Sequence, residues 1–130
     1  MNDHELGFTT FLAEPTQRRV RTLLELGPKR RKDVRALLDH AVQLDSRYAQ
    51  HLHGSDASAR SVEAALRKYG APKTCYVISA DEALDGQEMP LSDALDTVAA
   101  SDFGAFISCI PGKLGYFEYE DMKSAYVLKK

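Results

Sequence analysis

The apolar residues of this 130-residue chain change their spacing at about residue 73, and this change constrains the fold more than any other feature. Before it, apolar side chains recur every three to four residues, the spacing that gathers them on one face of an α-helix. After it, short runs rich in β-branched and aromatic residues predominate, and such runs are typical of strands. We therefore expect an α+β fold in a single domain of residues 1–130, helical over about 14–70 and strand-rich over about 74–130.

Three helices are expected in the first half of the chain. The first begins near Pro15, a residue tolerated in the first turn of a helix, and ends at Gly27 and Pro28. The third covers about 58–70, and Gly70 provides its C-terminal stop.

The second helix is less simple, because a polar residue interrupts its apolar stripe. Apolar residues keep the helical spacing from Val34 to Leu52, which predicts a helix of about four to six turns. Asp45 falls inside that stripe. Either Asp45 faces the core, which is costly unless it is hydrogen-bonded, or the helix breaks and Asp45 or Ser46 caps a new turn. Of these two interpretations the break is preferred.

The second half of the chain is predicted to form a small sheet. The run at 75–79 is typical of an inner strand, and the segments 103–110 and 114–120 have the strongest strand patterns. Pro and Gly at 111–112 favour a tight turn between these two strands. A last run, 125–128, is expected to add an edge strand.

These elements predict three N-terminal helices packed on one face of a largely antiparallel sheet with three to four strands. One further short helix is expected at 91–98, with Ser92 as its cap. Because side-chain character alternates along 114–120, one face of that strand is expected in the core and the other at least partly exposed.

Charge is distributed unevenly along the chain although the net charge is only −2. Between residues 16 and 36 there are eight basic residues against Glu25 and Asp33, so this segment carries an excess of six positive charges. Residues 81–102 contain seven carboxylates and no Lys or Arg. The near-neutral total therefore predicts a dipolar molecule.

The basic segment is the first candidate site. Its four consecutive cations at 29–32 precede a helix N-terminus, where the backbone dipole favours negative charge, so an external anion would relieve an unfavourable arrangement. The candidate anion-binding or partner-binding residues are Arg18, Arg21, Lys29, Arg30, Arg31, Lys32 and Arg35. The candidate acidic surface consists of Asp81, Glu82, Asp85 and Glu88. The alternative is a solvated basic face balanced by the acidic half of the same molecule.

No cofactor or metal is predicted. The acidic loop at 81–86 resembles a calcium loop only superficially, because Ala83 occupies its third ligand position and Ser92 stands where a bidentate Glu would be needed. His40 and His51 are not accompanied by any zinc-binding pattern. The two cysteines, Cys75 and Cys109, lie on predicted strands and are interpreted as small buried hydrophobes.

The location expected from these features is the cytoplasm. The first residues lack both a basic start and an apolar run, so no signal peptide is predicted. No apolar stretch approaches the length of a membrane span, and membrane binding is not expected. Two cysteines without an export signal are most simply reduced thiols.

The charge distribution favours a non-enzymatic, bacterial-type binding or regulatory domain that acts through a charge-complementary surface. Its partner would be another protein or a second copy of the chain. Nucleic-acid binding through 18–35 is an alternative, but no aromatic residue is interleaved with the basic ones and no helix-turn-helix or RNA-binding signature is present. A small enzyme with a pocket containing Cys109, a histidine and Tyr116 is a second alternative.

Overall fold

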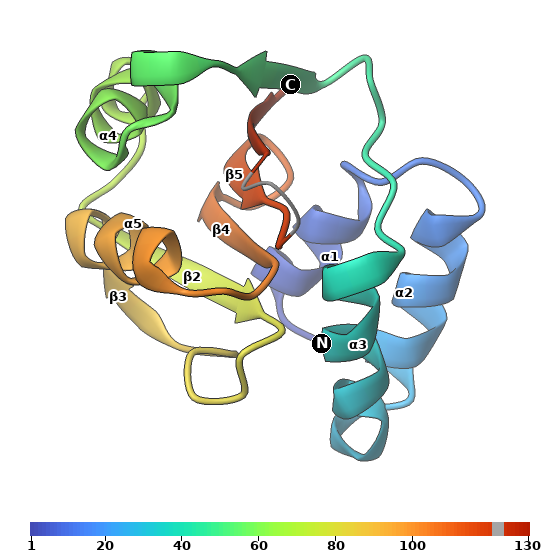
Figure 1. Ribbon diagram of the computed structural model, residues 1–130. Helices are drawn as coiled ribbons and strands as arrows, with labels where there is room; N and C mark the ends of the chain where they lie inside the picture. Colours follow the sequence, from blue (N-terminus) through green and yellow to red (C-terminus); the bar gives the residue numbers. More distant parts are fainter. Residues whose placement is uncertain (121–123) are drawn as a thin grey trace.

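The structure is a computed structural model that describes residues 1–120 and 124–130, and it is built around an open six-stranded antiparallel sheet (Figure 1). The order of the strands across the sheet is β1-β6-β5-β4-β2-β3. Their bounds are β1 (Ala49–Leu52), β2 (Thr74–Ser79), β3 (Glu88–Pro90), β4 (Ala105–Ile110), β5 (Leu114–Glu118) and β6 (Ala125–Lys129). The predicted α+β class and antiparallel pairing are confirmed, and the sheet has two strands more than the largest number expected.

Three helices cover one face of the sheet. They are α1 (Asp3–Thr9), α2 (Thr16–Glu25) and α3 (Arg31–His40), with a short 3-10 turn, η1 (Pro28–Arg30), joining the last two. The core under them is aromatic: the Phe8 ring stacks on Phe106 at 4.5 Å between centroids, and Phe117 lies beside them, fully buried. This packing fixes α1 against the centre of the sheet.

Two helices cover the opposite face, as Figure 1 shows. They are α4 (Ala59–Lys68), preceded by the 3-10 turn η2 (Gly54–Ala57), and α5 (Leu91–Ala100). Val62 and Leu66 of α4 join Val77 and Ile107 of the sheet in a second buried cluster. The third predicted helix therefore exists, but it lies on the face opposite to the other N-terminal helices.

The predicted second helix is wrong beyond residue 40. Helix α3 ends at His40, and the chain turns through Asp45, whose backbone N–H donates to the Phe11 carbonyl at 2.8 Å. The Asp45 carboxylate accepts the Arg47 N–H at 3.0 Å, which stabilises the turn. The helix therefore ends as the preferred interpretation required, but at His40 and not at Asp45, and residues 49–52 form strand β1 against β6 instead of helix.

Strands β4 and β5 form the predicted hairpin. Gly112 adopts a φ of +69°, and the Lys113 N–H donates to the Ile110 carbonyl at 3.0 Å. Every residue of β5 is buried, so the expected exposed face of this strand is wrong, because helices cover both faces of the sheet. Strand β6 is not the predicted edge strand, since β1 pairs with its outer side.

Candidate functional site

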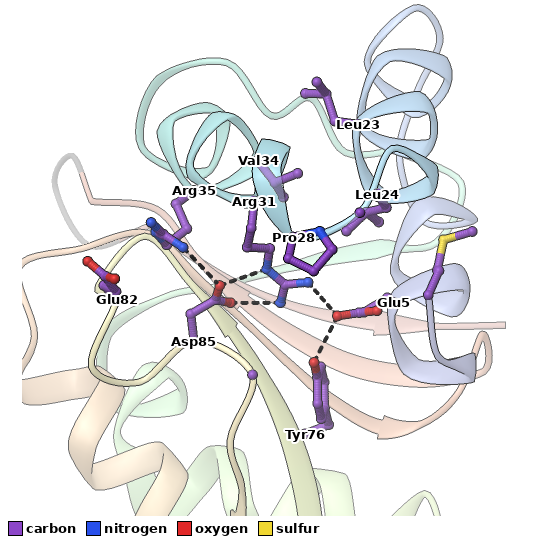
Figure 2. A pocket seen from close by; sticks show the side chains of 13 residues that line it. Glu5, Leu23, Leu24, Pro28, Arg31, Val34, Arg35, Tyr76, Glu82 and Asp85 are labelled. Atoms are coloured by element: carbon purple, nitrogen blue, oxygen red, sulfur yellow. Dashed lines mark hydrogen bonds and ion pairs between the residues drawn. The ribbon is translucent and has the colours of Figure 1, made fainter.

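A pocket of about 410 Å³ lies between the start of α1, the α2–α3 turn and the loop that joins β2 to β3 (Figure 2). Its apolar wall is formed by Leu23 and Leu24 from the end of α2 and by Val34 from α3. Val34 and Leu23 lie on the buried stripes of amphipathic helices, which is why α2 and α3 present apolar atoms here.

Arg31 lies at the centre of the polar side of this pocket. Its Nε donates to Asp85 Oδ2 at 2.7 Å and its Nη2 donates to Asp85 Oδ1 at 2.9 Å, a bidentate pair. Its Nη1 also donates to Glu5 Oε2. Arg35, one helical turn further along α3, places Nη1 3.7 Å from Asp85 Oδ2. Two carboxylates and two guanidinium groups thus balance one another at the pocket.

Glu5 connects this ion-pair network to the sheet. Tyr76 on β2 donates its hydroxyl to Glu5 Oε2 at 2.8 Å, and the Asn2 backbone N–H donates to Oε1 at 2.9 Å. Burial by itself raises the pKa of Glu5, but the hydrogen bonds from Asn2, Arg31 and Tyr76 outweigh it and lower that pKa. Glu5 is therefore a carboxylate at neutral pH.

The same contacts shift the pKa values of the two side chains that donate to Glu5, Arg31 and Tyr76. Burial opposes the charged form of Arg31, yet its bonds with Asp85 and Glu5 raise the pKa of the guanidinium. Burial, followed by the hydrogen bond to Glu5, raises the pKa of the Tyr76 hydroxyl. At neutral pH Glu5 is therefore ionised, the Arg31 guanidinium is charged and the Tyr76 hydroxyl is neutral.

Three residues of the sequence-based candidate sets meet in this network, namely Arg31, Arg35 and Asp85. Glu82, a fourth, is exposed at the rim of the pocket. Glu5 and Tyr76 were not predicted. One sequence signal could have indicated Glu5, because Asn2 and Glu5 have the spacing of a capping box, and both reciprocal hydrogen bonds of that motif are present.

The other predicted basic residues lie on the surface. Arg18, Arg21 and Arg30 pair with Glu14 at 3.8 Å, Glu25 at 3.1 Å and Asp33 at 2.6 Å, each three or four residues away in the sequence. Exposed pairs of this kind contribute little to stability and exchange readily with other partners. Lys29 and Lys32 are exposed and have no ion pair with the described residues, 1–120 and 124–130.

The acidic residues do not form a separate pole of the molecule. Asp85 is almost fully buried against Arg31, with 5 % of its side chain exposed. Asp81 accepts the backbone N–H of Ala83 at 3.0 Å and so shapes the loop, and Glu88 is exposed on the edge strand β3. The expectation of two well-separated charged regions is wrong, since the loop at 80–87 lies against α3.

The residues suggested for a thiol enzyme lie elsewhere. Cys109 and Cys75 are buried under α4 and α5, and burial raises the pKa of each thiol to about 12. A thiolate is therefore disfavoured at neutral pH. Tyr116 is buried on the same face, with its hydroxyl 3.4 Å from Glu118 Oε2.

A serine–histidine contact also escaped the sequence reasoning. His4 Nδ1 lies 2.7 Å from Ser108 Oγ, and the His4 ring stacks on Tyr76. Ser108 is only 1 % exposed and is not part of the pocket lining, so this contact anchors α1 on β4. Among the residues that the structure describes, no group of three or more His, Cys, Asp or Glu side chains is arranged to hold a metal ion.

The fold and the pocket together define an α+β domain with a two-sided helical cover and a buried arginine–carboxylate network. Within the described ranges no helix has the length and apolar character needed to cross a membrane. No protein-family model, curated protein or solved structure shows significant similarity to this chain.

Proposed function

We propose that this chain is a non-enzymatic binding domain that engages a protein partner through the exposed cations around the α2–α3 turn. We call this the cationic turn surface and define it by Arg18, Arg19, Arg21, Lys29, Arg30 and Lys32. The observation that carries the proposal is the state of Lys29 and Lys32, which are exposed and lack a carboxylate partner in the described part of the chain. The six cations of this surface face three paired carboxylates, Glu14, Glu25 and Asp33, so Lys29, Lys32 and Arg19 leave an excess of three positive charges.

An apolar side chain within this surface favours a protein partner over nucleic acid. Leu26, between α2 and the turn, is 59 % exposed. Protein interfaces combine an apolar centre with a charged rim, whereas phosphate backbones are bound by polar and cationic groups. The partner that fits is a protein with an apolar side chain surrounded by carboxylates.

A second copy of the chain is one protein with a suitable surface. Glu82 is exposed on the β2–β3 loop, and Figure 2 shows it on the side of the pocket where Arg35 lies. When cationic and acidic groups lie side by side on one face, a two-fold axis can pair the cations of each copy with the carboxylates of the other. A cytoplasmic location belongs to the same proposal, and the two buried free thiols agree with it.

A photo-crosslinking amino acid placed at Leu26 tests the proposal directly in cells of the source organism. We expect a covalent adduct with another protein or with a second copy of the chain, visible as a protease-sensitive band of higher mass. The same group placed at Ala64, exposed on α4 across the sheet, is the matched control and is expected to give no such band. A nuclease-sensitive adduct would show that this surface binds nucleic acid and not a protein. The absence of any adduct specific to position 26 would refute the proposed surface.

Charge reversal identifies the contribution of the lysines. The double variant Lys29→Glu, Lys32→Glu is expected to abolish the adduct formed from position 26 and to leave the fold intact, because both side chains are exposed. The control is Lys68→Glu, Lys73→Glu, which changes net charge equally at exposed positions elsewhere and is expected to retain the adduct. Equal yields from the two double variants would contradict a charge-complementary interface.

A further inference from the structure

We infer that the pocket between α1, the α2–α3 turn and the β2–β3 loop binds a small neutral molecule that presents a carbonyl-type acceptor beside an apolar group. This site is separate from the cationic turn surface, because its cations are Arg31 and Arg35, whose guanidinium groups lie beside Asp85 inside the pocket (Figure 2). The inference depends on the numbers of free hydrogen-bond donors and acceptors at the pocket, on its charge balance and on its shape.

Hydrogen-bond donors are in excess at this pocket. A guanidinium has five N–H donors, and Arg31 uses three of them on Asp85 and Glu5. Arg35 is close enough to Asp85 for an ion pair but makes no hydrogen bond with the described residues. Two donors of Arg31 and all those of Arg35 therefore remain for solvent or a ligand.

The carboxylates beside these arginines have little capacity left. Asp85 accepts two hydrogen bonds from Arg31 and a third from the Ser79 backbone N–H at 3.1 Å. Glu5 likewise accepts three, from Arg31, Tyr76 and the Asn2 backbone. A ligand that completes the pocket must bring acceptors and not donors to its inner end.

Charge balance selects a neutral acceptor. The inner charges, Arg31 and Arg35 against Glu5 and Asp85, cancel, and Glu82 adds a negative charge at the rim. An anion would be desolvated without a net positive charge to compensate it, and a cation would meet carboxylates that are already occupied. A carbonyl oxygen accepts hydrogen bonds without carrying a full charge into the pocket.

The apolar wall determines the rest of the ligand. Leu23, Leu24 and Val34 form one side of the pocket, and Pro28 closes it at the turn. A volume of about 410 Å³ lies in the range of small-molecule sites, which combine apolar walls with a few convergent polar groups. A compact ring that bears an amide or a similar carbonyl fits both the apolar wall and the guanidinium donors opposite it.

Three probes that share one ring test this chemistry: benzamide is neutral with a carbonyl, benzoate is anionic and benzamidine is cationic. Each is titrated into the ¹⁵N-labelled full chain while the amide and arginine Nε–H signals are followed by NMR. We expect benzamide to shift the signals of Val34, Arg31 and Arg35 in a saturable manner, with benzoate and benzamidine at least several-fold weaker. Tighter binding of either charged probe would overturn the neutral class, and no saturable shift with any of the three would overturn the site.

Removing one free guanidinium separates pocket binding from surface binding. Arg35→Met is expected to weaken benzamide about tenfold, since a hydrogen bond to a charged donor is lost. Arg19→Met removes an exposed arginine that does not line this pocket and is expected to leave benzamide binding unchanged. Equal effects of the two substitutions on benzamide binding, or no effect from either, would contradict the assignment of benzamide to this pocket. An unchanged melting temperature confirms that both variants are folded.

Discussion

At the scale of single residues, Arg31 shows how a charge can be removed from the surface without being neutralised by proton loss. Asp85 holds its guanidinium from one side and Glu5 from another, and 19 % of the side chain is exposed. Its sequence neighbours Arg30 and Lys32 point to solvent, because a helix turns each successive side chain by about 100°. A run of four cations therefore serves two purposes, internal pairing and surface charge.

Glu5 gives the network a defined pH dependence. Burial raises its pKa, but the bonds from Asn2, Arg31 and Tyr76 prevail and lower it below the ordinary value of 4.5. A lowered pKa in the folded state means that the stabilisation is fully present above about pH 4.5 and is lost as the pH falls through the folded value. We expect the free energy of unfolding to decline below pH 4.5.

The variant Glu5→Gln isolates this contribution. It is expected to be less stable than the parent at pH 7, by about 1–2 kcal/mol, and to lose less stability between pH 4.5 and pH 3. Urea unfolding at a series of pH values measures both quantities. Parallel stability curves for parent and variant would show that Glu5 does not titrate as described.

The two cysteines are expected to be inert in the folded chain. Both are 3 % exposed, and burial raises the pKa of each to about 12. Their reaction with a thiol reagent at pH 8 should be limited by unfolding, and both should react at once in denaturant. Rapid modification of either thiol in the native protein would contradict its burial and reopen a thiol-based activity.

At the scale of elements, the close contact of α1 with the β4–β5 turn depends on the absence of a side chain at Gly7. A Cβ at this position would lie 2.3 Å from the Gly112 backbone nitrogen, which cannot move aside as a flexible side chain could. Gly7→Ala is therefore expected to destabilise the fold by about 1–3 kcal/mol. Leu6→Ala, at a partly exposed neighbour, is the control and should cost less than about 1 kcal/mol in thermal or urea unfolding.

Elements with strong local patterns were predictable, and elements formed through distant partners were not. The 111–112 turn and the strands that flank it follow from Pro and Gly chemistry and β-branched runs. Strand β1 was predicted as helix, because Tyr48 and Leu52 continue a helical spacing while the partner that makes 49–52 a strand lies at 125–128. Helix α1 was missed although its capping box is visible in the sequence.

At the scale of the whole molecule, the candidate site was only half predictable. Composition indicated the basic and acidic residues, but Arg31 and Asp85 are 54 positions apart in the sequence, and their contact depends on how α3 packs on the sheet. Tyr76 gave no signal at all, since nothing in a strand pattern says that a hydroxyl will face a glutamate. The charge pattern therefore predicted which residue types matter and misplaced them relative to one another.

The Arg31–Asp85 pair joins the N-terminal helical layer to the β2–β3 loop. The polar side of the pocket depends on this pair, and so does the difference between the inward-facing Arg31 and the exposed cations beside it. A double-mutant cycle of Arg31→Met and Asp85→Asn, measured by urea unfolding at neutral pH, tests this pair most directly. We expect each single variant to lose about 2 kcal/mol and the two to couple by at least about 1 kcal/mol. Either change alone removes a bidentate pair and leaves a poorly exposed charge with weaker partners, Arg31 with Glu5 only and Asp85 with Arg35 at 3.7 Å. Strictly additive losses, with a coupling energy near zero, would show that Arg31 does not turn inward, and the account of the pocket and the surface would then be wrong.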